Sequence, residues 1–253
     1  MAAKILDGRA LAAEMREAVA ARAGGLRARG IAPLLAVAIV GEDAASESYV
    51  RSIVNTGSKT GVDVRIERLA GDAQEAGVRD LLRALGEDPL VHGVILQQPL
   101  PRHLAIRAIA EAMPPHKDVD GANPMNLGRL AFSSGTAFVP ATPQACMLLL
   151  ERSERAALEG VRACVVGRSN VVGLPVALLL LAKNASVTIV HSRTREMAHY
   201  TRDAEVLVAA TGVAGVIRAA MVAPGATVID VGTAYVDGKL TGDVAYDEVA
   251  EVA

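Results

Sequence analysis

Apolar residues along this chain fall into short runs that alternate with amphipathic segments. Leu11, Met15, Ala18 and their apolar neighbours follow helical spacing up to Gly24-Gly25, so we predict a first helix that ends there. The next stretch predicts, in order, a strand at 34–41, a helix at 46–60, a strand at 62–69, a helix at 77–88 and a strand within 92–101 that runs into a proline-bounded turn. This βαβα order predicts a parallel sheet with right-handed crossovers.

The same pattern restarts at Gly160 after a loop-rich stretch. Residues 113–143 are rich in Pro, Gly, Asn and Asp, which is typical of a domain junction, and ligands favour such junctions. Beyond it we predict strands at 161–167, 186–192, 205–211 and 226–232, and helices at 174–184 and 195–202. Four apolar strands with short crossovers indicate a doubly wound nucleotide-binding domain. The fold class is therefore α/β with two domains.

Composition agrees with this fold class and excludes two classes of function. Of the 253 residues, 51% are hydrophobic and 2% aromatic, so an aliphatic core is expected, which suits helices on both faces of a parallel sheet. The 26 basic and 28 acidic side chains nearly cancel, so we expect no nucleic-acid partner. The longest apolar run, residues 171–182, contains Gly and Pro and is shorter than the roughly 20 residues of a bilayer span, so we expect no membrane segment.

The cysteines and histidines suggest no reactive or metal centre. Cys146 and Cys164 stand beside apolar residues without paired spacing, which fits reduced, buried thiols and a cytoplasmic location. The five histidines form no HxxH or HxxxH pair, so we expect no metal site, and no nucleophile elbow supports Ser-His-Asp hydrolysis. The amphipathic, Arg-containing N-terminus is compatible with a transit peptide, but Asp7, Glu14 and Glu17 favour an ordinary first helix.

A candidate dinucleotide loop, VVGRSNVVG, directly follows a predicted strand and opens a predicted helix. Its spacing departs from GxGxxG, because Ser169 replaces the second glycine and Gly173 comes one residue late. The next strand ends in His191-Ser192-Arg193-Thr194 without an acid for a ribose 2′-hydroxyl, so arginines favour NADP over NAD. The alternative is that these arginines are solvated loop residues. The predicted cofactor-binding set is Gly167, Arg168, Ser169, Gly173, Ser192, Arg193, Thr211, Gly232 and Thr233.

Eight segments together resemble one family in order and spacing. They are GEDAASESYV, GVILQQPLP, KDVDGANPMNLG, VPATP, VVGRSNVVGLP, VTIVHSRT, VIDVG and GDV. They are similar to the bifunctional methylenetetrahydrofolate dehydrogenase/cyclohydrolase (FolD) proteins over about residues 3 to 250. The resemblance implies a subunit, usually in a homodimer, with a folate cleft between a catalytic α/β domain and a Rossmann-like domain. It also implies NADP-dependent oxidation of 5,10-methylenetetrahydrofolate to the methenyl form, which water then opens to 10-formyltetrahydrofolate.

The resemblance also gives the expected domain limits. We predict a catalytic, folate-binding α/β domain at 1–120, junction loops at 121–145 and a Rossmann-like NADP-binding domain at 146–242. Residues 243–253 are expected to start a C-terminal helix that returns toward the catalytic domain. The family's PVPGGVGPMT segment, which closes part of the cleft after GDV, does not occur here. Either the sequence is a piece of a longer chain, or the site is more open than in the family.

Three of the family's four catalytic positions are carried over. The resemblance implies that Tyr49 packs on the aminobenzoate of the folate, that Gln97 assists the family's lysine and that Asp120 holds the pterin. Each has a simpler reading: an ordinary half-buried aromatic, a polar strand end and an Asx-turn residue, respectively. The family's YVxxK motif ends here in Ile53 instead of lysine. On a helix Lys59 would lie about 9 Å along the axis from Ile53, so it is not expected to replace that lysine.

The missing lysine affects the two reactions unequally. Hydride departure needs position and orientation, whereas hydrolysis needs proton transfers, which a placed acid or base accelerates by about 10²–10⁴-fold. The first hypothesis is thus a dehydrogenase with weak or absent cyclohydrolase activity. Ile53, with Ala141 and Ala145 where the family has Cys and Gly, equally suggests a paralogue for another one-carbon carrier. A non-catalytic ligand-binding paralogue is the third.

Overall fold

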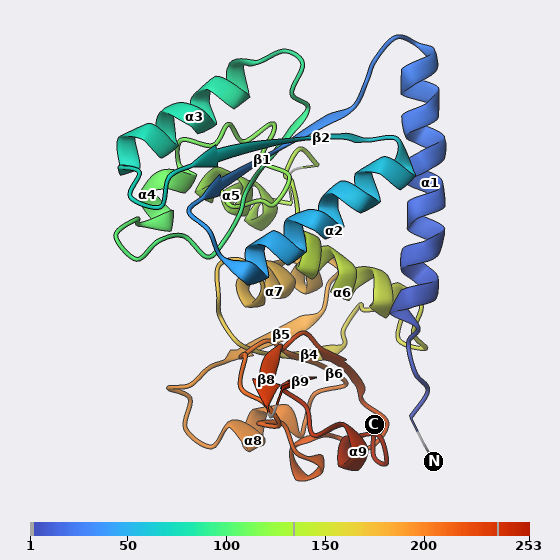
Figure 1. Cartoon of the computed structure of the whole chain (residues 1–253). Helices are drawn as coiled ribbons and strands as arrows, with labels where there is room; N and C mark the ends of the chain where they lie inside the picture. Colours follow the sequence, from blue (N-terminus) through green and yellow to red (C-terminus); the bar gives the residue numbers. More distant parts are fainter. Residues whose placement is uncertain (1–2, 134, 237) are drawn as a thin grey trace. The chain divides into compact units, whose positions relative to one another are not determined.

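The computed structural model describes residues 3–133, 135–236 and 238–253. These form two compact units (Figure 1). Unit 1 contains Met1–Asp7, Leu130–Ser134 and Val139–Ala253, and unit 2 contains Gly8–Arg129 and Gly135–Phe138. The fold therefore has the two α/β parts that the sequence predicts, although the chain enters unit 1 before it builds unit 2.

Unit 2 contains a three-stranded parallel sheet with β1 (Leu34–Val40) in the middle. β2 (Asp63–Leu69) and β3 (Gly93–Leu96) lie on either side of it. The helices around it are α1 (Gly8–Ala28), α2 (Ala44–Thr60), α3 (Glu75–Glu87) and α4 (Ile106–Ala110), and α5 (Pro124–Ala131) follows them in the chain. All three strands and the helices α2 and α3 lie where the apolar pattern predicts them.

Side chains of β1 alternate between two apolar layers, as a strand dictates. Ala36, Ala38 and Val40 belong to a buried cluster with α3 and α4 residues, and Val37 and Ile39 belong to a second cluster with α2 residues. All five β1 residues are at most 6% exposed. Since both faces of the strand are covered, its continuous apolar run is explained.

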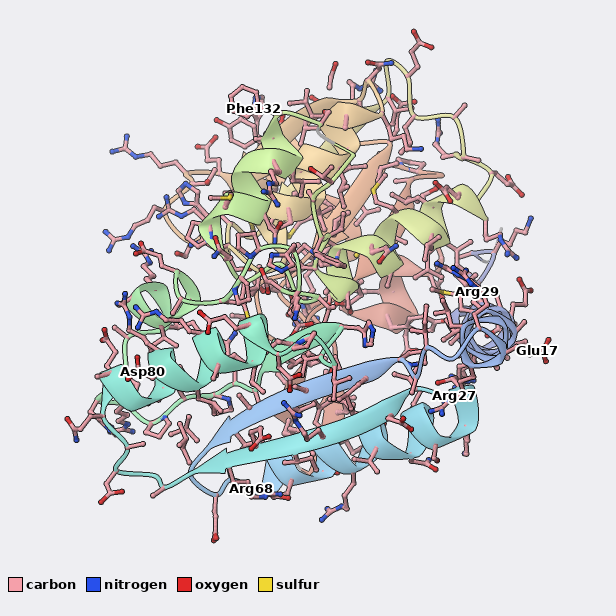
Figure 2. All side chains as sticks on the ribbon, turned by 90° about the horizontal axis from the view of Figure 1, so that it is seen from above. Glu17, Arg27, Arg29, Arg68, Asp80 and Phe132 are labelled. Atoms are coloured by element: carbon pink, nitrogen blue, oxygen red, sulfur yellow. The ribbon has the colours of Figure 1, made fainter. Side chains whose placement is uncertain are left out.

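An arginine of a neighbouring element contacts each end of α2; both arginines, Arg27 and Arg68, are labelled in Figure 2. At the C-terminal end, Arg27 of α1 donates to the carbonyl of Gly61 and to the carboxylate of Asp63. At the N-terminal end, both guanidinium nitrogens of Arg68 in β2 donate to the carboxylate of Glu47. Both ion pairs are exposed, so solvent screens them and each contributes little to stability.

Unit 1 contains a four-stranded parallel sheet of order β5-β4-β6-β7. The strands are β4 (Arg162–Val166), β5 (Ser186–Val190), β6 (Val206–Ala209) and β7 (Thr227–Asp230). Around them lie α6 (Ala141–Glu151), α7 (Gly173–Ala182), α8 (Met197–Thr201), the 3₁₀ turn Ala219–Met221, the antiparallel pair β8 (Ala234–Val236) and β9 (Lys239–Thr241), and α9 (Tyr246–Val249). The order reverses at β4, which is the switch point of a doubly wound sheet.

Two expectations from the sequence are wrong. The first helix continues through Gly24-Gly25 to Ala28, because Ala23 and Arg27 reach the end of α2 at Gly61. The expected junction loops at 121–145 contain α5 and the start of α6. The expected C-terminal helix is α9; Val249 and Val252 pack in a core cluster with β4 and β6 residues of unit 1, and its return toward the catalytic domain stays a prediction.

No helix in the described ranges is both long enough and apolar enough to cross a membrane.

Candidate functional site

In unit 1 the four parallel strands end side by side. The register pairs Val166 of β4 with Val190 of β5 and with Ala209 of β6, and pairs Ala209 with Asp230 of β7. The residues that follow each strand therefore emerge along one edge of the sheet. Crevices at the carboxyl ends of open parallel sheets are the usual ligand sites of doubly wound folds. All nine predicted cofactor-binding residues lie after one of these four ends or at the start of α7.

The loop after β4 is packed too closely for side chains at its two glycines. Gly167 has φ +133°, and a Cβ on it would lie 2.2 Å from the carbonyl oxygen of Ala210. A Cβ on Gly173 would lie 2.3 Å from the carbonyl oxygen of Gly167. These contacts explain on steric grounds why both positions are occupied by glycine, and they leave the backbone uncovered by side chains at the edge. Such a turn at a helix start fits the pyrophosphate of a dinucleotide.

Ser169 has a structural role that the fingerprint glycine could not fill. Its hydroxyl oxygen accepts from the backbone N–H of Val172 at 3.2 Å and of Gly173 at 3.3 Å. Two amides at the start of α7 are therefore partnered by the chain itself. The amide of Gly173 therefore already has a partner within the loop.

The loop after β5 is a closed turn that leaves two candidate side chains exposed. The N–H of His191 donates to the hydroxyl of Thr194 at 3.0 Å, and the N–H of Thr194 donates back to the carbonyl of His191 at 2.7 Å. Ser192 and Arg193 are exposed at its tip, as is Arg168 after β4. A hydroxyl and guanidinium groups at this edge suit a ribose 2′-phosphate.

The last candidate residues of this edge depend on two carboxylates that the sequence alone did not single out. The carboxylate of buried Asp243 accepts from the N–H of Thr211 and of Gly212, and the N–H of Gly232 donates to Asp230 at 3.0 Å. Thr211 and Gly232 are therefore held by backbone contacts to these acids. Asp243 lies in the quoted GDV segment, and its partner amides are more than 30 positions away, so local pattern carries no signal for it.

In unit 2, Tyr49 and Ile53 lie one turn apart on α2. Tyr49 is 55% exposed, whereas Ile53 is partly buried and packs against the apolar cluster of Val37, Ile39, Val50 and Ile95. Partial burial, and then the nearby carboxyl of Asp120, raise the pKa of Tyr49. The structure thus places the carboxyl of Asp120 near Tyr49, whereas Ile53, one turn further along α2, packs into the apolar cluster.

Asp118, two residues before Asp120, binds the backbone that follows it. The fully buried carboxylate of Asp118 accepts from the N–H groups of Ala122 and Asn123 and from the side-chain amide of Asn126, at 2.8 to 3.0 Å. Burial, and then the negative charge of Asp118, raise the pKa of Asp120. Asp118 is the positioning residue that sequence reasoning missed; the Asp-Val-Asp-Gly spacing was the available signal.

Gln97 ends β3 in a structural hydrogen bond. Its N–H continues the ladder to the carbonyl of Ala38, and its side-chain Nε2 donates to the carbonyl of Gln98 at 2.6 Å. The hydroxyl of Ser46, in the first turn of α2, donates to the same carbonyl. Gln97 and Ser46 of α2, the helix that carries Tyr49, therefore share one acceptor, the carbonyl of Gln98.

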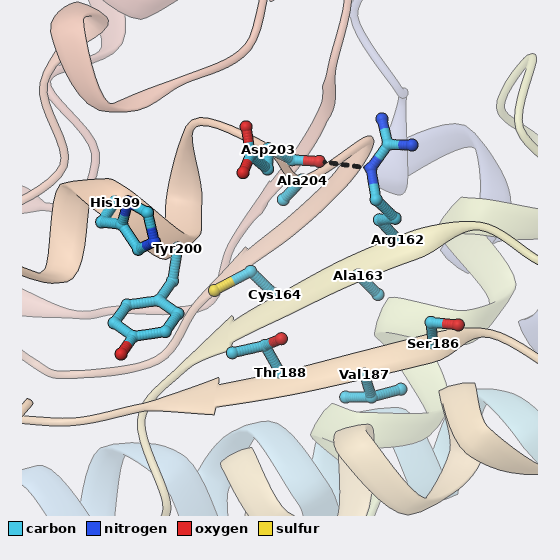
Figure 3. A pocket seen from close by; sticks show the side chains of 10 residues that line it. All are labelled: Arg162, Ala163, Cys164, Ser186, Val187, Thr188, His199, Tyr200, Asp203 and Ala204. Carbon is cyan, nitrogen blue, oxygen red and sulfur yellow. Dashed lines mark hydrogen bonds between the residues drawn. The ribbon is translucent and has the colours of Figure 1, made fainter.

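A pocket of about 330 Å³ lies elsewhere in unit 1 (Figure 3). Its lining includes Arg162 and Ser186 at the amino ends of β4 and β5, and His199 and Tyr200 of α8. Because it begins at the amino ends of the strands, it does not coincide with the predicted cofactor edge. In residues 3–133, 135–236 and 238–253, no group of three or more His, Cys, Asp or Glu could hold a metal ion.

The fold and these residues define a class: a two-unit α/β enzyme scaffold with a dinucleotide-binding edge on one unit. Comparison with known proteins identifies the family. The catalytic-domain model of tetrahydrofolate dehydrogenase/cyclohydrolase matches residues 6–120, and the NAD(P)-binding-domain model matches residues 140–253. The chain belongs to the tetrahydrofolate dehydrogenase/cyclohydrolase family, and unit 1 holds its NAD(P)-binding domain.

Individual relatives agree over the full chain. The bifunctional protein FolD of Variovorax paradoxus (strain S110) is 46% identical over 100% of this chain and 89% of that protein. The solved bifunctional FolD of Campylobacter jejuni has a TM-score of 0.96 and 36% identity, covering 98% of this chain and 88% of that one. FolD of Trypanosoma brucei, solved with NADP and an inhibitor, has a TM-score of 0.91 and 33% identity, covering 99% and 88%. The predictions of family, fold and dinucleotide cofactor are confirmed.

Proposed function

We propose that this chain oxidises 5,10-methylenetetrahydrofolate to 5,10-methenyltetrahydrofolate with NADP, and that its cyclohydrolase activity is weak or absent. The observation that carries the second part is the position of Ile53, one helical turn from Tyr49, where the resemblance implies a lysine. Its side chain packs on Val50 and Ile95 and cannot transfer a proton.

The dehydrogenase step is compatible with an apolar residue at this position. The C–H bond of the methylene carbon breaks with its electron pair, while a lone pair of the adjacent nitrogen forms the C=N bond of the methenyl cation. NADP, when bound, accepts that hydride. No proton moves, so the protein has to bind and orient the carbon and exclude water.

We assign the folate contacts to unit 2. Tyr49, half exposed on α2, offers a ring face to the aminobenzoate, and Asp120, whose carboxyl is near it, accepts hydrogen bonds from the pterin. Because the pKa of Asp120 is raised, it retains a proton at higher pH than an ordinary aspartate. Gln97 lies at the end of β3 with its amide already bonded to Gln98, so we expect it to shape the site and not to transfer protons.

Hydrolysis makes demands that this site meets poorly. Water must lose a proton as it attacks the methenyl carbon, and a ring nitrogen must gain one as the ring opens. The named relatives from V. paradoxus and C. jejuni are bifunctional, so retention of both activities is the competing expectation. The charged neighbours Arg51 and Lys59 on α2 are exposed, and Arg51 lies near Glu47.

The decisive experiment follows the methenyl absorbance. Tetrahydrofolate, formaldehyde and NADP are added to the enzyme, and the methenyl product is monitored after NADPH formation has ended. Decay at the buffer rate supports the proposal, and decay at least about 100-fold faster than buffer contradicts its cyclohydrolase part. A parallel reaction with NAD tests the cofactor preference.

The alternative that the chain's own residues favour is a substrate other than this folate. Ile53 on α2, and Ala141 and Ala145, which are exposed on α6, all depart from the family's motifs. If NADP raises the melting temperature of the protein but the folate is not turned over, the result would favour another one-carbon carrier or a purely binding role.

We also propose a cytoplasmic homodimer. Cys146 and Cys164 are free and buried, and burial raises their thiol pKa values to about 11 and 12, so both are inert, reduced thiols. β5 is an edge strand of its sheet, with Ile189 39% exposed, and such an edge is a ready surface for a second copy. Light scattering of the purified protein measures the oligomeric state.

A further inference from the structure

Two aspartates and two glycines interlock at the carboxyl edge of the sheet in unit 1. A Cβ added to Gly232 would lie 1.9 Å from Oδ1 of Asp243, and a Cβ added to Gly242 would lie 1.9 Å from Oδ2 of Asp230. The carboxylate of each aspartate thus fills the side-chain space of the glycine beside the other. We call these four residues the Asp-Gly clasp.

The clasp joins three segments that are distant in sequence. Asp230, at the end of β7, accepts from the N–H groups of Gly232, Asp243 and Val244, each at 3.0 Å. Asp243 accepts in turn, through Oδ2, from the N–H groups of Thr211 and Gly212 after β6. The loop after β6, the loop after β7 and residues 242–244 are therefore held as one body.

The segment that carries Asp243 is itself firmly attached. The N–H of Ile217 donates to the carbonyl of Asp243 at 2.9 Å, and the N–H of Ala245 donates to the carbonyl of Ile217 at 2.9 Å. Asp243 is 0% exposed, and its Oδ1 has no hydrogen-bond partner within the described ranges. The carboxylate of Asp243 therefore has one oxygen bonded to two amides, while the other oxygen lies against Gly232.

We infer that Asp243 is a positioning residue for cofactor binding: through the clasp it fixes the loops after β6 and β7, which carry Thr211, Gly232 and Thr233. This inference rests on the proposed binding of NADP at that edge. Asp243 itself is buried, so it acts through the backbone of these loops. Loops held in the bound conformation bind a ligand without a further ordering cost.

The test uses the full chain with Asp243→Asn, which keeps the size of the side chain but removes its charge. We expect the Kd for NADP, measured by calorimetry, to rise on the order of 10- to 100-fold, because hydrogen bonds to a charged acceptor are lost or weakened. The KM for NADP should rise with it, while kcat at saturating NADP changes much less. Hydrogen exchange without cofactor should quicken in the peptide that contains Thr211 and Gly212 but not in β4.

A second variant leaves Asp243 intact. Gly242→Ala places a methyl group against Asp230 and should disturb the clasp from its other half, with the same rise in Kd and the same local gain in exchange. Asp203→Asn is the matched control, since Asp203 is exposed and lines the pocket of Figure 3. It should change neither quantity.

Two results would overturn the inference. One is a Kd within about twofold of the wild type in whichever of the two clasp variants folds. The other is exchange that quickens in β4 as much as in the loop, because that shows a general role in stability. If the wild type fails to bind NADP, the proposed cofactor is wrong, and the exchange of the Thr211–Gly212 amides still decides whether the clasp orders the loop.

Discussion

The two units hold their candidate residues by different means. In unit 1 the cofactor edge is made of backbone: strand ends in register, two glycines without room for a side chain, and amides bonded to Ser169, Asp230 and Asp243. In unit 2 the folate candidates are side chains from α2, β3 and the loop before α5. The backbone edge depends on its glycines and on the bonds to its amides, whereas a site made of side chains changes its chemistry with one residue. Ile53 is the example in unit 2.

The largest effect is expected from restoring an ionisable group in unit 2. Ile53→Lys should accelerate methenyl hydrolysis by about 10²–10⁴-fold, because an amine can reach the Tyr49 face while its stem keeps the apolar packing of Ile53. Ile53→Met, similar in length but uncharged, is the control. If the methenyl product decays at the same rate with the two variants, the residue at position 53 is not the only one that limits hydrolysis.

A single methyl group added to the loop after β4 should be enough to weaken NADP binding. Gly167→Ala puts a methyl group against the carbonyl of Ala210 at φ +133°, so we expect NADP binding to weaken about 10- to 100-fold and unfolding free energy to fall by about 1–3 kcal/mol. Calorimetry and urea unfolding measure the two effects. Gly77→Ala, in α3 where nothing lies within 4 Å of the added methyl group, should leave NADP affinity unchanged. Normal NADP binding by Gly167→Ala would refute the proposed fit.

Truncating one side chain at the same edge should change the preference between NADP and NAD, while the dinucleotide still binds. Arg193→Ala removes an exposed guanidinium after β5, so we expect NADP affinity to fall about tenfold and NAD affinity to stay unchanged. Arg195→Ala, also exposed and two residues further on, is the control. An equal loss for both cofactors would assign Arg193 to another part of the dinucleotide or to the fold.

The smallest expected effect is a stability gain from Asp120→Asn. The pKa of Asp120 is raised in the folded state, so the folded state binds this proton more tightly than the unfolded state does. The bound proton therefore stabilises the fold below the ordinary pKa of 3.8. This stabilisation is lost as the pH rises through the raised pKa. The asparagine variant should therefore melt a few degrees higher than wild type near pH 7, with a size set by about 2–4 °C per kcal/mol, and show little difference at low pH.

Asp118→Asn is the contrast for this measurement. Asp118 uses both oxygens as acceptors for three donors, so its amide should destabilise the protein at neutral pH. If Asp120→Asn also melts lower than wild type at neutral pH, burial is not the dominant influence on Asp120.

Strands such as β1 and β6 were predictable because they are buried on both faces and read as continuous apolar runs. α5 was missed because Pro124, Gly128 and two asparagines at its start suggest a loop, while buried bonds from Asp118 to Asn123 and Asn126 order it. Tyr49, Ile53 and Asp120 were predicted from two short segments of contiguous residues, and their roles stay predictions. Asp243 was not, since its partners at Thr211 and Gly212 are neighbours in space alone.

The loops that follow the strand ends in unit 1 differ in how far they depend on one another. Val190, Val166, Ala209 and Asp230 stop at one height, so each connection starts from its own strand. The turn at 191–194 closes on itself through Thr194, which makes it the easiest piece to transplant. Drift in coenzyme choice during evolution thus needs one short segment to vary, while the interlocked loops after β6 and β7 must vary together.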